Sequence, residues 1–300
     1  MDAPRLNVIG CGRAAGTLAL LWRMRRLVRI GAVLNRTAES AQAAVARLGQ
    51  GIAANDYGDF PEAPLWLIGV PDTDIEGVAG ALAASGRAKP GDVAFHLAGT
   101  HGPRALRALS AAGLHVASVH PWHAFSGDPD NHGGGARSGG NPLAGSHCVA
   151  EGDSVSLAAL QPLFEAIGCD WIEASISDRA RYHAAAVLVS NAPRALLSEA
   201  TRWLQHVGLP LAEARALAAG LLRETALELA GRHAGYGLTG PVERGDAVTV
   251  QRHLESLANE RSEDQALYRA MSRAILRLAE EEGRLTPDRA ARIASLLDAG

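Results

Sequence analysis

The spacing of apolar residues divides the 300-residue chain into two regions. In the first, short apolar runs alternate with segments of helical periodicity. In the second, the periodicity is helical throughout, with breaks at 208–210, 235–241 and 286–287. Strands that alternate with helices form a mostly parallel sheet with both faces covered. The pattern therefore predicts an α/β domain over residues 1–175 and an all-α domain of about five helices over residues 176–300. The predicted strands lie near residues 5–10, 28–34, 65–70, 92–98, 114–120, 146–150 and 169–174.

The first predicted strand runs directly into a glycine-rich turn, Gly10-x-Gly12-x-x-Ala15-Gly16, and then into a helix. Gly10 allows a tight reversal, Gly12 has no side chain to hold a pyrophosphate away from the backbone, and the small residues that follow let the helix pack close to the strand. The first free N–H groups of such a helix face the phosphates. The turn predicts a dinucleotide-binding domain of the Rossmann type. The alternative is an ordinary strand-to-helix turn.

The end of the second strand bears on which dinucleotide binds. NAD-binding domains place an Asp or Glu there, whereas this strand ends in Asn35-Arg36-Thr37. A carboxylate would repel the 2′-phosphate of NADP, while a guanidinium pairs with it and stacks on adenine. Asn35 and Thr37 add neutral donors. We therefore predict NADP(H) rather than NAD as the cofactor. The alternative is that Arg36 is a solvated residue at the start of a helix.

Polar residues follow three more predicted strands, at 70–72, 96–100 and 118–121. Open parallel sheets bind ligands at the carboxyl ends of their strands, so these segments converge on one predicted site. Pro71 is also a common residue at the start of a helix. The residues predicted to bind the cofactor are Gly10, Gly12, Arg13, Ala14, Asn35, Arg36, Thr37, Val70, Pro71, Ala98 and Gly99.

The segment RYHAAAVLVSN, residues 181–191, carries polar groups on an otherwise apolar helix. His183 and Ser190 lie on nearly one face of this helix, and Asn191 lies about a quarter-turn away. We expect the helix to bury these three residues among Ala and Val, so that their polar groups need partners. Reduction of a carbonyl or imine by hydride needs a proton donor and a hydrogen bond to the developing charge. His183 is the predicted proton donor, and Asn191 is predicted to orient the carbonyl. The alternative is that these residues cap the helix or bridge to the neighbouring domain.

A loop between two predicted helices, LTGPVERGD at residues 238–246, is dense in residues that fix the backbone and carry charge. Arg244 is predicted to clamp a substrate carboxylate, with Thr239 hydrogen-bonded to the same ligand. Asp246 is placed to cap the helix that begins at Ala247. The alternative is a solvated turn with internal ion pairing.

Composition excludes several other classes of function. There are 29 basic and 32 acidic residues, a formal net charge of −3, with no run of one sign, which predicts a small-molecule substrate and no nucleic-acid or membrane partner. The three cysteines are too widely spaced for a disulfide framework and are predicted to be buried small hydrophobic residues. No signal peptide or transmembrane stretch is visible, which predicts a cytoplasmic protein. The irregular segment 126–142 is a surface insertion or a lid. The spacing of the histidines favours no metal site; those considered are His120, His123, His132 and His147.

Together these segments resemble a known family. The ordered set GCGRAAGTLA, VPD, HLAGT, SVHP, YHAAAVLVSN and LTGPVERGD is similar to Rossmann-like oxidoreductases whose C-terminal helical domain has no assigned function. That family is related to pyrroline-5-carboxylate reductase and to deazaflavin-dependent NADP oxidoreductases. Some members resemble an alternative ketopantoate reductase, which implies NADPH-driven reduction of a 2-oxo acid in the interdomain cleft. By analogy the resemblance also implies a homodimer formed through the helical domain.

One departure from related enzymes affects the substrate. Related hydroxyacid dehydrogenases place a Lys and an Asn four residues apart on the corresponding helix, whereas this chain has His183 and Val187 at that spacing. The proton donor therefore cannot be carried over from them. The alternatives to a 2-oxo acid reductase are an imine reductase, a deazaflavin reductase and a non-catalytic NADP-binding sensor or scaffold.

Overall fold

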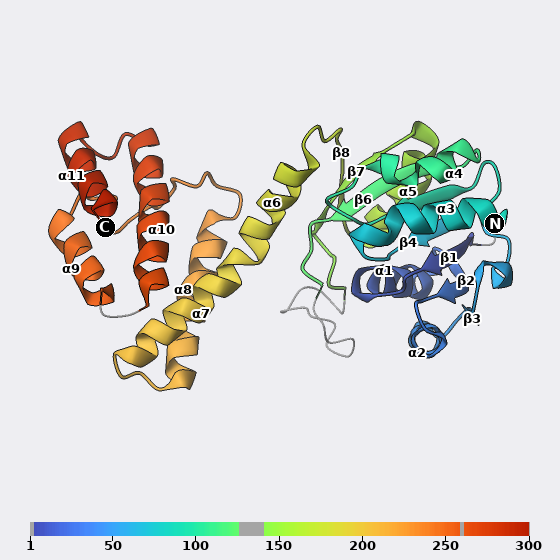
Figure 1. Cartoon of the computed structure of the whole chain (residues 1–300), viewed down its shortest axis with the longest axis horizontal. Helices are drawn as coiled ribbons and strands as arrows, with labels where there is room; N and C mark the ends of the chain where they lie inside the picture. The colour runs from blue at the N-terminus through green and yellow to red at the C-terminus, as the bar shows by residue number, and fades with distance from the viewer. Residues whose placement is uncertain (1–2, 126–140, 259–260, 300) are drawn as a thin grey trace. The chain divides into compact units, whose positions relative to one another are not determined.

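The computed structural model describes residues 3–125, 141–258 and 261–299. The chain forms two compact units, Met1–Pro193 and Arg194–Gly300, and each is described by itself (Figure 1). The sequence predicted a boundary at residue 175, but contacts group the next helix with the first unit. The predicted class, a mostly parallel α/β sheet followed by helices, is confirmed.

Among the described residues of the first unit, eight strands form one sheet in the order β3-β2-β1-β4-β5-β6-β7-β8. All neighbours are parallel except β6 and β7. The sequence predicted every strand but β3, which has three residues at the sheet edge and is too short to show a pattern. The strands are β1 Arg5–Ile9, β2 Arg29–Leu34, β3 Ile52–Ala54, β4 Leu65–Ile68, β5 Val93–His96, β6 His115–Pro121, β7 His147–Gly152 and β8 Asp170–Glu173.

Two apolar clusters cover the two faces of this sheet. Trp22, Phe95 and Phe164 are fully buried in one, and Phe60 and Trp66 are fully buried in the other. The strand order reverses between β1 and β4, and such switch points open the crevice in which α/β proteins bind ligands. The helices of this unit are α1 Arg13–Met24, α2 Ala38–Leu48, α3 Ile75–Ser85, α4 Arg107–Ala111, α5 Ser154–Ala166 and α6 Arg179–Ser190, with short 3₁₀ turns at Tyr57–Asp59, Asp72–Asp74 and Pro103–Leu106.

The second unit is helical, and the three predicted breaks fall between its helices, but the break between α9 and α10 was not predicted. Helices α9, α10 and α11 share a core that includes Val250, Leu276 and Ile293. The described residues after 176 hold six helices rather than about five. Besides α6 they are α7 Ala192–His206, which begins at the end of the first unit, α8 Leu211–Leu229, α9 Ala247–Leu257, α10 Ser262–Glu281 and α11 Pro287–Asp298. No helix within the described ranges is long and apolar enough to cross a membrane.

Helix α6 differs from its sequence-based prediction. We expected His183, Ser190 and Asn191 to be buried among its apolar residues, but no residue of α6 is buried in this chain. Ser190 and Asn191 are exposed, and the Ser190 hydroxyl donates to the carbonyl of Ala186 at 2.7 Å. The prediction failed because an apolar helix need not be covered by its own chain.

Candidate functional site

The glycine turn packs as the fingerprint requires. Gly10 follows β1 with φ +82°, and a Cβ there would lie 2.7 Å from the carbonyl carbon of Gly69 and from the nitrogen of Val70. A Cβ on Gly69 would in turn collide with Ala15. Only glycines let the ends of β1 and β4 and the start of α1 approach this closely. The predicted packing roles of Gly10 and Ala15 are confirmed.

The amino-terminal end of α1 is open. Gly12 precedes the helix with no side-chain cap, the first turn contains no acidic residue, and a Cβ on Gly12 would meet no heavy atom within 4 Å. Arg13 is exposed, and Ala14 is half-buried beside it. The first N–H groups of a helix carry a partial positive charge and need acceptors. This end of α1 can therefore accept an anion such as a pyrophosphate.

Residues that follow β2 form hydrogen bonds that fix the glycine turn after β1. Asn35 Oδ1 accepts the N–H of Cys11 at 2.7 Å, and its Nδ2 donates to the carbonyl of Ser40 at 2.9 Å. Thr37 caps α2, and its Oγ1 accepts the N–H of Ser40 at 3.2 Å. Arg47 also braces the turn, because its Nη2 donates to the carbonyl of Cys11 at 3.3 Å. Sequence reasoning missed the bracing by Asn35 and Arg47, since no local pattern indicates either contact.

Arg36 stands beside this brace with an exposed side chain. In the part of the chain that the structure describes, its guanidinium makes no hydrogen bond or ion pair. An unpaired guanidinium at the end of β2 matches the sequence-based interpretation that this position receives a phosphate.

The loop after β5 is held by His96, which is fully buried. Its Nδ1 accepts the N–H of Ala98 at 3.2 Å, so its Nε2–H donates to the carbonyl of Gly102 at 3.0 Å. Burial lowers the pKa of His96 to about 4, which keeps the ring neutral. Because a neutral imidazole has one donor and one acceptor, both ring nitrogens are satisfied. His96 therefore fixes the backbone around Gly99.

The three polar strand ends meet, as predicted. The hydroxyl of Thr100, after β5, donates to the carboxylate of Asp72, after β4. The hydroxyl of Ser118, on β6, donates to the carbonyl of His101 at 3.1 Å. Val70 and Pro71 lie between β4 and Asp72, and the side chain of Val70 borders Gly10. The carboxyl ends of β1, β4, β5 and β6 thus form one continuous edge.

An aromatic cluster lies on this edge. The hydroxyl of Tyr182 is 2.8 Å from Nδ1 of His120 and accepts the indole N–H of Trp122 at 2.5 Å. The rings of His120 and His183 have centroids 6.0 Å apart. Nδ1 of His183 is buried and has no hydrogen-bond partner in the described structure. A Cβ on Gly99 would lie 2.8 Å from that nitrogen and 2.8 Å from Cε1 of His120.

Charge around this cluster is fixed by α6 and β7. Arg179, in the first turn of α6, pairs with Glu151 of β7, and its Cζ lies 5.7 Å from the ring centroid of Tyr182. Burial, with smaller contributions from the nearby His183 and Arg179, lowers the pKa of His120 to about 4. Burial raises the pKa of Tyr182. At neutral pH the site therefore holds an uncharged His120 and a protonated Tyr182 hydroxyl.

Sequence reasoning selected His183 but missed the partners of His120. It considered His120 only as a metal ligand, although the segment that contains it was already noted as a strand end. Trp122 and Tyr182 are 60 residues apart in the sequence. Because nothing in either segment indicates the other, only the fold brings them together.

The other predicted substrate residues come from other segments of the chain. Asn191 follows the last residue of α6, eight residues after His183 and so about 12 Å further along the helix axis. Thr239 and Arg244 are exposed in the loop before α9, in the second unit, whereas His183 belongs to the first. Their grouping with His183 stays a prediction. Asp246 caps α9 by accepting the N–H of Thr249 at 3.0 Å, as predicted.

The loop that carries Arg244 is tied to α10 and the residues after it. Glu243 pairs with Arg284 at 3.5 Å, and Nη1 of Arg284 donates to the carbonyl of Leu238 at 3.0 Å. Val242 is buried in the core of the second unit. These contacts fix the backbone on both sides of Arg244, whose own side chain forms no ion pair among the described residues.

The remaining histidines considered at the outset have other partners. His123 Nδ1 lies 3.3 Å from the hydroxyl of Ser146, and His147 lies 3.3 Å from Asp170. His132 and all of the segment 126–142 except its last two residues lie outside the described residues. Within the described ranges no group of three or more His, Cys, Asp or Glu side chains is arranged to hold a metal ion. Cys11, Cys148 and Cys169 are buried free thiols, as predicted.

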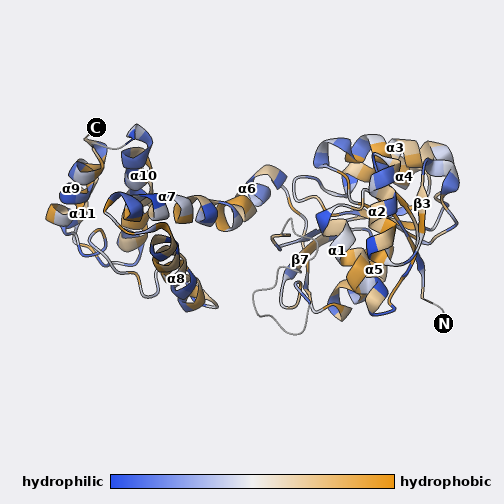
Figure 2. Cartoon of the chain, turned by 90° about the horizontal axis from the view of Figure 1, so that it is seen from below, coloured by the Kyte–Doolittle hydropathy of each residue, from blue (hydrophilic) through white to orange (hydrophobic). Residues whose placement is uncertain are grey.

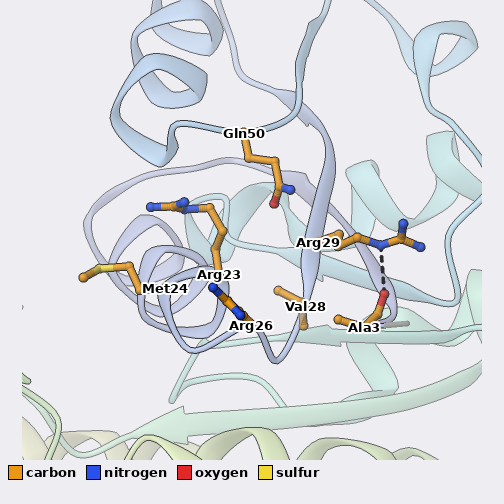
Figure 3. Close-up of a pocket in the computed structure, with 7 residues that line it drawn as sticks. All are labelled: Ala3, Arg23, Met24, Arg26, Val28, Arg29 and Gln50. Atoms are coloured by element: carbon orange, nitrogen blue, oxygen red, sulfur yellow. Dashed lines mark hydrogen bonds between the residues drawn. The ribbon is translucent and has the colours of Figure 1, made fainter. Parts of the chain in front are cut away.

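A separate cavity of about 580 Å³ lies at the opposite edge of the sheet, near the amino-terminal ends of β1 and β2. Figure 3 shows that the side chains of Arg23 and Arg29 point in opposite directions there rather than toward one another. Arg29 donates to the carbonyl of Ala3 at 3.0 Å. The residues that line the cavity are Ala3, Arg23, Met24, Arg26, Val28, Arg29 and Gln50. The cavity is not part of the site built by the carboxyl ends of the strands.

Comparisons with known proteins agree with this architecture. Residues 1–121 match the model of a Rossmann-like domain, and residues 146–275 match a domain of unknown function, DUF2520. No curated protein matches the sequence. Both family models lie within regions that the structure assigns to the sheet and to the helices after it.

Solved structures share the fold. The protein BF3122 of Bacteroides fragilis, a proposed NADP oxidoreductase, is 22% identical with a TM-score of 0.70, over 91% of this chain and 98% of that one. An imine reductase of Myxococcus stipitatus in complex with NADP⁺ is 18% identical with a TM-score of 0.61, over 94% and 96%. A 1-pyrroline-5-carboxylate reductase of Streptococcus pyogenes is 15% identical with a TM-score of 0.55, over 95% and 100%.

Proposed function

We propose that this chain is an NADPH-dependent oxidoreductase that reduces a small carbonyl compound bearing a carboxylate, of the ketopantoate-like 2-oxo acid class. The observation that carries the proposal is that two features lie at the same edge of the sheet, the one formed by the carboxyl ends of the strands. One is the open, uncapped start of α1 behind a dinucleotide turn. The other is an imidazole with a buried, unpartnered nitrogen, His183, packed against Gly99.

The residues of this edge fit NADP(H). Gly10, Gly12, Arg13 and Ala14 form the turn and the first helical N–H groups, which suit the pyrophosphate. Arg36 is exposed without an ion-pair partner among the described residues, which suits the 2′-phosphate. The imine reductase of similar fold is known in complex with NADP⁺, which supports the same choice. When bound, the reduced cofactor supplies the hydride.

The chain's own residues supply the proton and the orientation. In the proposed reaction the carbonyl carbon gains the hydride, the carbon–oxygen π bond opens toward oxygen, and His183 gives that oxygen a proton. Thr239 with Arg244 holds the carboxylate. Arg244 supports this role because its guanidinium is exposed while the flanking backbone is tied down by Glu243 and Arg284.

The proposed assembly is a homodimer formed through the helical region. Exposed apolar side chains support it, because large exposed apolar patches mark interaction surfaces. On α8, Leu221 and Leu227 are each 68% exposed, and Leu188 on α6 is equally exposed. Figure 2 shows apolar residues along α8. A second copy of the chain is the partner we propose for these residues.

The function is tested by following NADPH oxidation with ketopantoate first, then with other 2-oxo acids and cyclic imines. His183→Gln is expected to lower kcat about 100-fold or more while leaving the Kd for NADPH unchanged. The matched control is His147→Gln, an exposed histidine of β7 that should leave both constants unchanged.

Other outcomes separate the alternative functions. Turnover of a cyclic imine but of no 2-oxo acid would replace the substrate class with that of an imine reductase. Tight NADPH binding without any turnover would favour a sensor, and binding of the deazaflavin cofactor would favour a deazaflavin reductase. Failure to bind NADPH would remove the proposal altogether.

A further inference from the structure

We propose that Trp122, Tyr182 and His120 form a directed hydrogen-bond chain that keeps the proton of His120 on Nε2, so that His120 donates a hydrogen bond to the substrate carbonyl while His183 supplies the proton. This role rests on the proposed reductase function. We call these three hydrogen-bonded residues, Trp122, Tyr182 and His120, the relay.

The direction of the relay follows from the donor inventory. An indole N–H only donates, so the Tyr182 oxygen accepts from Trp122 at 2.5 Å. The same hydroxyl lies 2.8 Å from Nδ1 of His120. If Nδ1–H donated to it, the oxygen would accept two bonds and the Tyr182 proton would need a third neighbour. Within the described residues the Tyr182 hydroxyl has no third hydrogen-bond partner. The indole N–H of Trp122, the Tyr182 hydroxyl and Nδ1 of His120 are all hydrogen-bonded only when Tyr182 donates to Nδ1.

His120 is uncharged at neutral pH, so the hydrogen bond at Nδ1 decides which ring nitrogen carries the single proton. Burial, together with His183 and Arg179, lowers its pKa to about 4. A neutral imidazole carries one proton, so acceptance at Nδ1 places that proton on Nε2. The groups that bear on its charge come from every element around it: Arg179, Tyr182 and His183 from α6, His96 from β5, Asp72 from the 3₁₀ turn after β4, and Trp122 after β6.

The free nitrogen of His120 faces the loop that holds Gly99. Its Nε2 lies 3.0 Å from the position of a Gly99 Cβ, and Nδ1 of His183 lies 2.8 Å from the same point. Nε2 makes no hydrogen bond within the described structure. Two imidazoles, one from β6 and one from α6, therefore converge on one glycine. Gly99 carries no side chain, and any Cβ there would displace both rings.

The two imidazoles then differ in chemical role. Two protonated rings with centroids 6.0 Å apart would repel each other, and a His120 that is uncharged at neutral pH avoids this repulsion. A neutral imidazole N–H stabilises charge that develops on a carbonyl oxygen without transferring its proton. In the reaction the oxygen receives its proton from His183, and His120 keeps its own.

The first experiment reads the tautomer directly. Long-range ¹⁵N–¹H NMR of the histidine rings in the full chain at pH 7, assigned with His120→Gln, is expected to show the Nε2–H tautomer for His120. Tyr182→Phe removes the hydroxyl and keeps the ring, so it should produce a mixture of tautomers. A proton on Nδ1 in the unsubstituted protein, or no change in Tyr182→Phe, would overturn the relay. This readout needs neither cofactor nor substrate.

The second experiment reads the catalytic consequence. Tyr182→Phe should lower kcat about 10-fold or more, with the Kd for NADPH unchanged, because a misplaced proton removes one donor to the developing charge. The matched control is Tyr268→Phe, which removes a hydroxyl 2.7 Å from Nδ1 of His253 in the second unit and should leave kcat unchanged.

The two experiments separate the possible failures. An unchanged kcat in Tyr182→Phe, together with the tautomer change, would overturn the donor role of His120. The expected tautomers without turnover of any substrate by the unsubstituted protein would overturn the proposed function and leave the relay standing.

Discussion

The two units differ in how completely they bury their own apolar residues. The sheet unit encloses Trp22, Trp66 and Phe95 without exposure. In the helical unit, α9 to α11 share a core, but α8 buries only Ala214 of its 19 residues. Helices in water owe most of their stability to packing of an apolar face. The comparison teaches that the two apolar clusters of the sheet are covered by the same chain, whereas α8, like α6 of the sheet unit, leaves apolar side chains exposed.

The largest effect is expected where the sheet unit is packed most tightly. Gly10→Ala places a Cβ 2.7 Å from backbone atoms of Gly69 and Val70 at a φ of +82°. It should lower the free energy of unfolding by roughly 3 kcal/mol and abolish NADPH binding. Urea unfolding and calorimetric titration measure the two effects.

The neighbouring glycine provides the control. Gly12→Ala meets nothing within 4 Å. It should cost less than about 1 kcal/mol of stability and still weaken NADPH binding, because the new methyl group occupies the ligand's space. Equal destabilisation by both variants would contradict the packing argument.

Lowering the pH should also destabilise the sheet unit, because buried His96 is neutral in the folded protein. Its pKa is about 4 in the folded protein, below its ordinary value of 6.5, so the unfolded chain binds the proton more tightly. The contribution of neutral His96 to the free energy of unfolding is therefore fully present above pH 6.5. It is lost as the pH falls from 6.5 toward 4, by up to about 3 kcal/mol. Urea unfolding at pH 7 and at pH 4.5 measures the loss. His96→Gln should be less stable at pH 7 and should show a smaller loss; an unchanged pH dependence would refute the assignment.

The proposed cofactor preference gives a smaller effect at the same edge. Arg36→Ala should raise the Kd for NADPH about 10- to 100-fold and leave the Kd for NADH nearly unchanged, since only NADPH carries the 2′-phosphate. Calorimetry with both nucleotides tests this. Arg87→Ala, which removes an exposed arginine after α3, is the control; equal weakening with NADH would argue against a phosphate contact.

The smallest effect tests the helical unit. Leu221→Glu should leave the unfolding of an isolated chain nearly unchanged, because the side chain is 68% exposed, but should raise the dimer dissociation constant about 10-fold or more. Sedimentation across a concentration series measures this. Met24→Glu, at an exposed position on α1 of the sheet unit, should not change dissociation. A monomeric unsubstituted protein at all concentrations would exclude the proposed assembly.

Part of this site was predictable because the signals are local. The turn at Gly10 and the cap at Asp246 each depend on a few adjacent residues, and their geometry is confirmed. The strand β3 was missed because three residues show no period. The burial predicted for α6 was wrong because amphipathic patterns do not say whether the covering surface belongs to the same chain.

The sequence alone determined the fold class, the strand-turn-helix at the amino-terminus and three of the breaks between helices, because these depend on residue spacing and backbone preference. Only the tertiary structure decided that Asn35 and Arg47 brace the turn and that Tyr182 meets His120. Such contacts join residues that are far apart along the chain. Their geometry is set by how strands and helices pack, which no local pattern records.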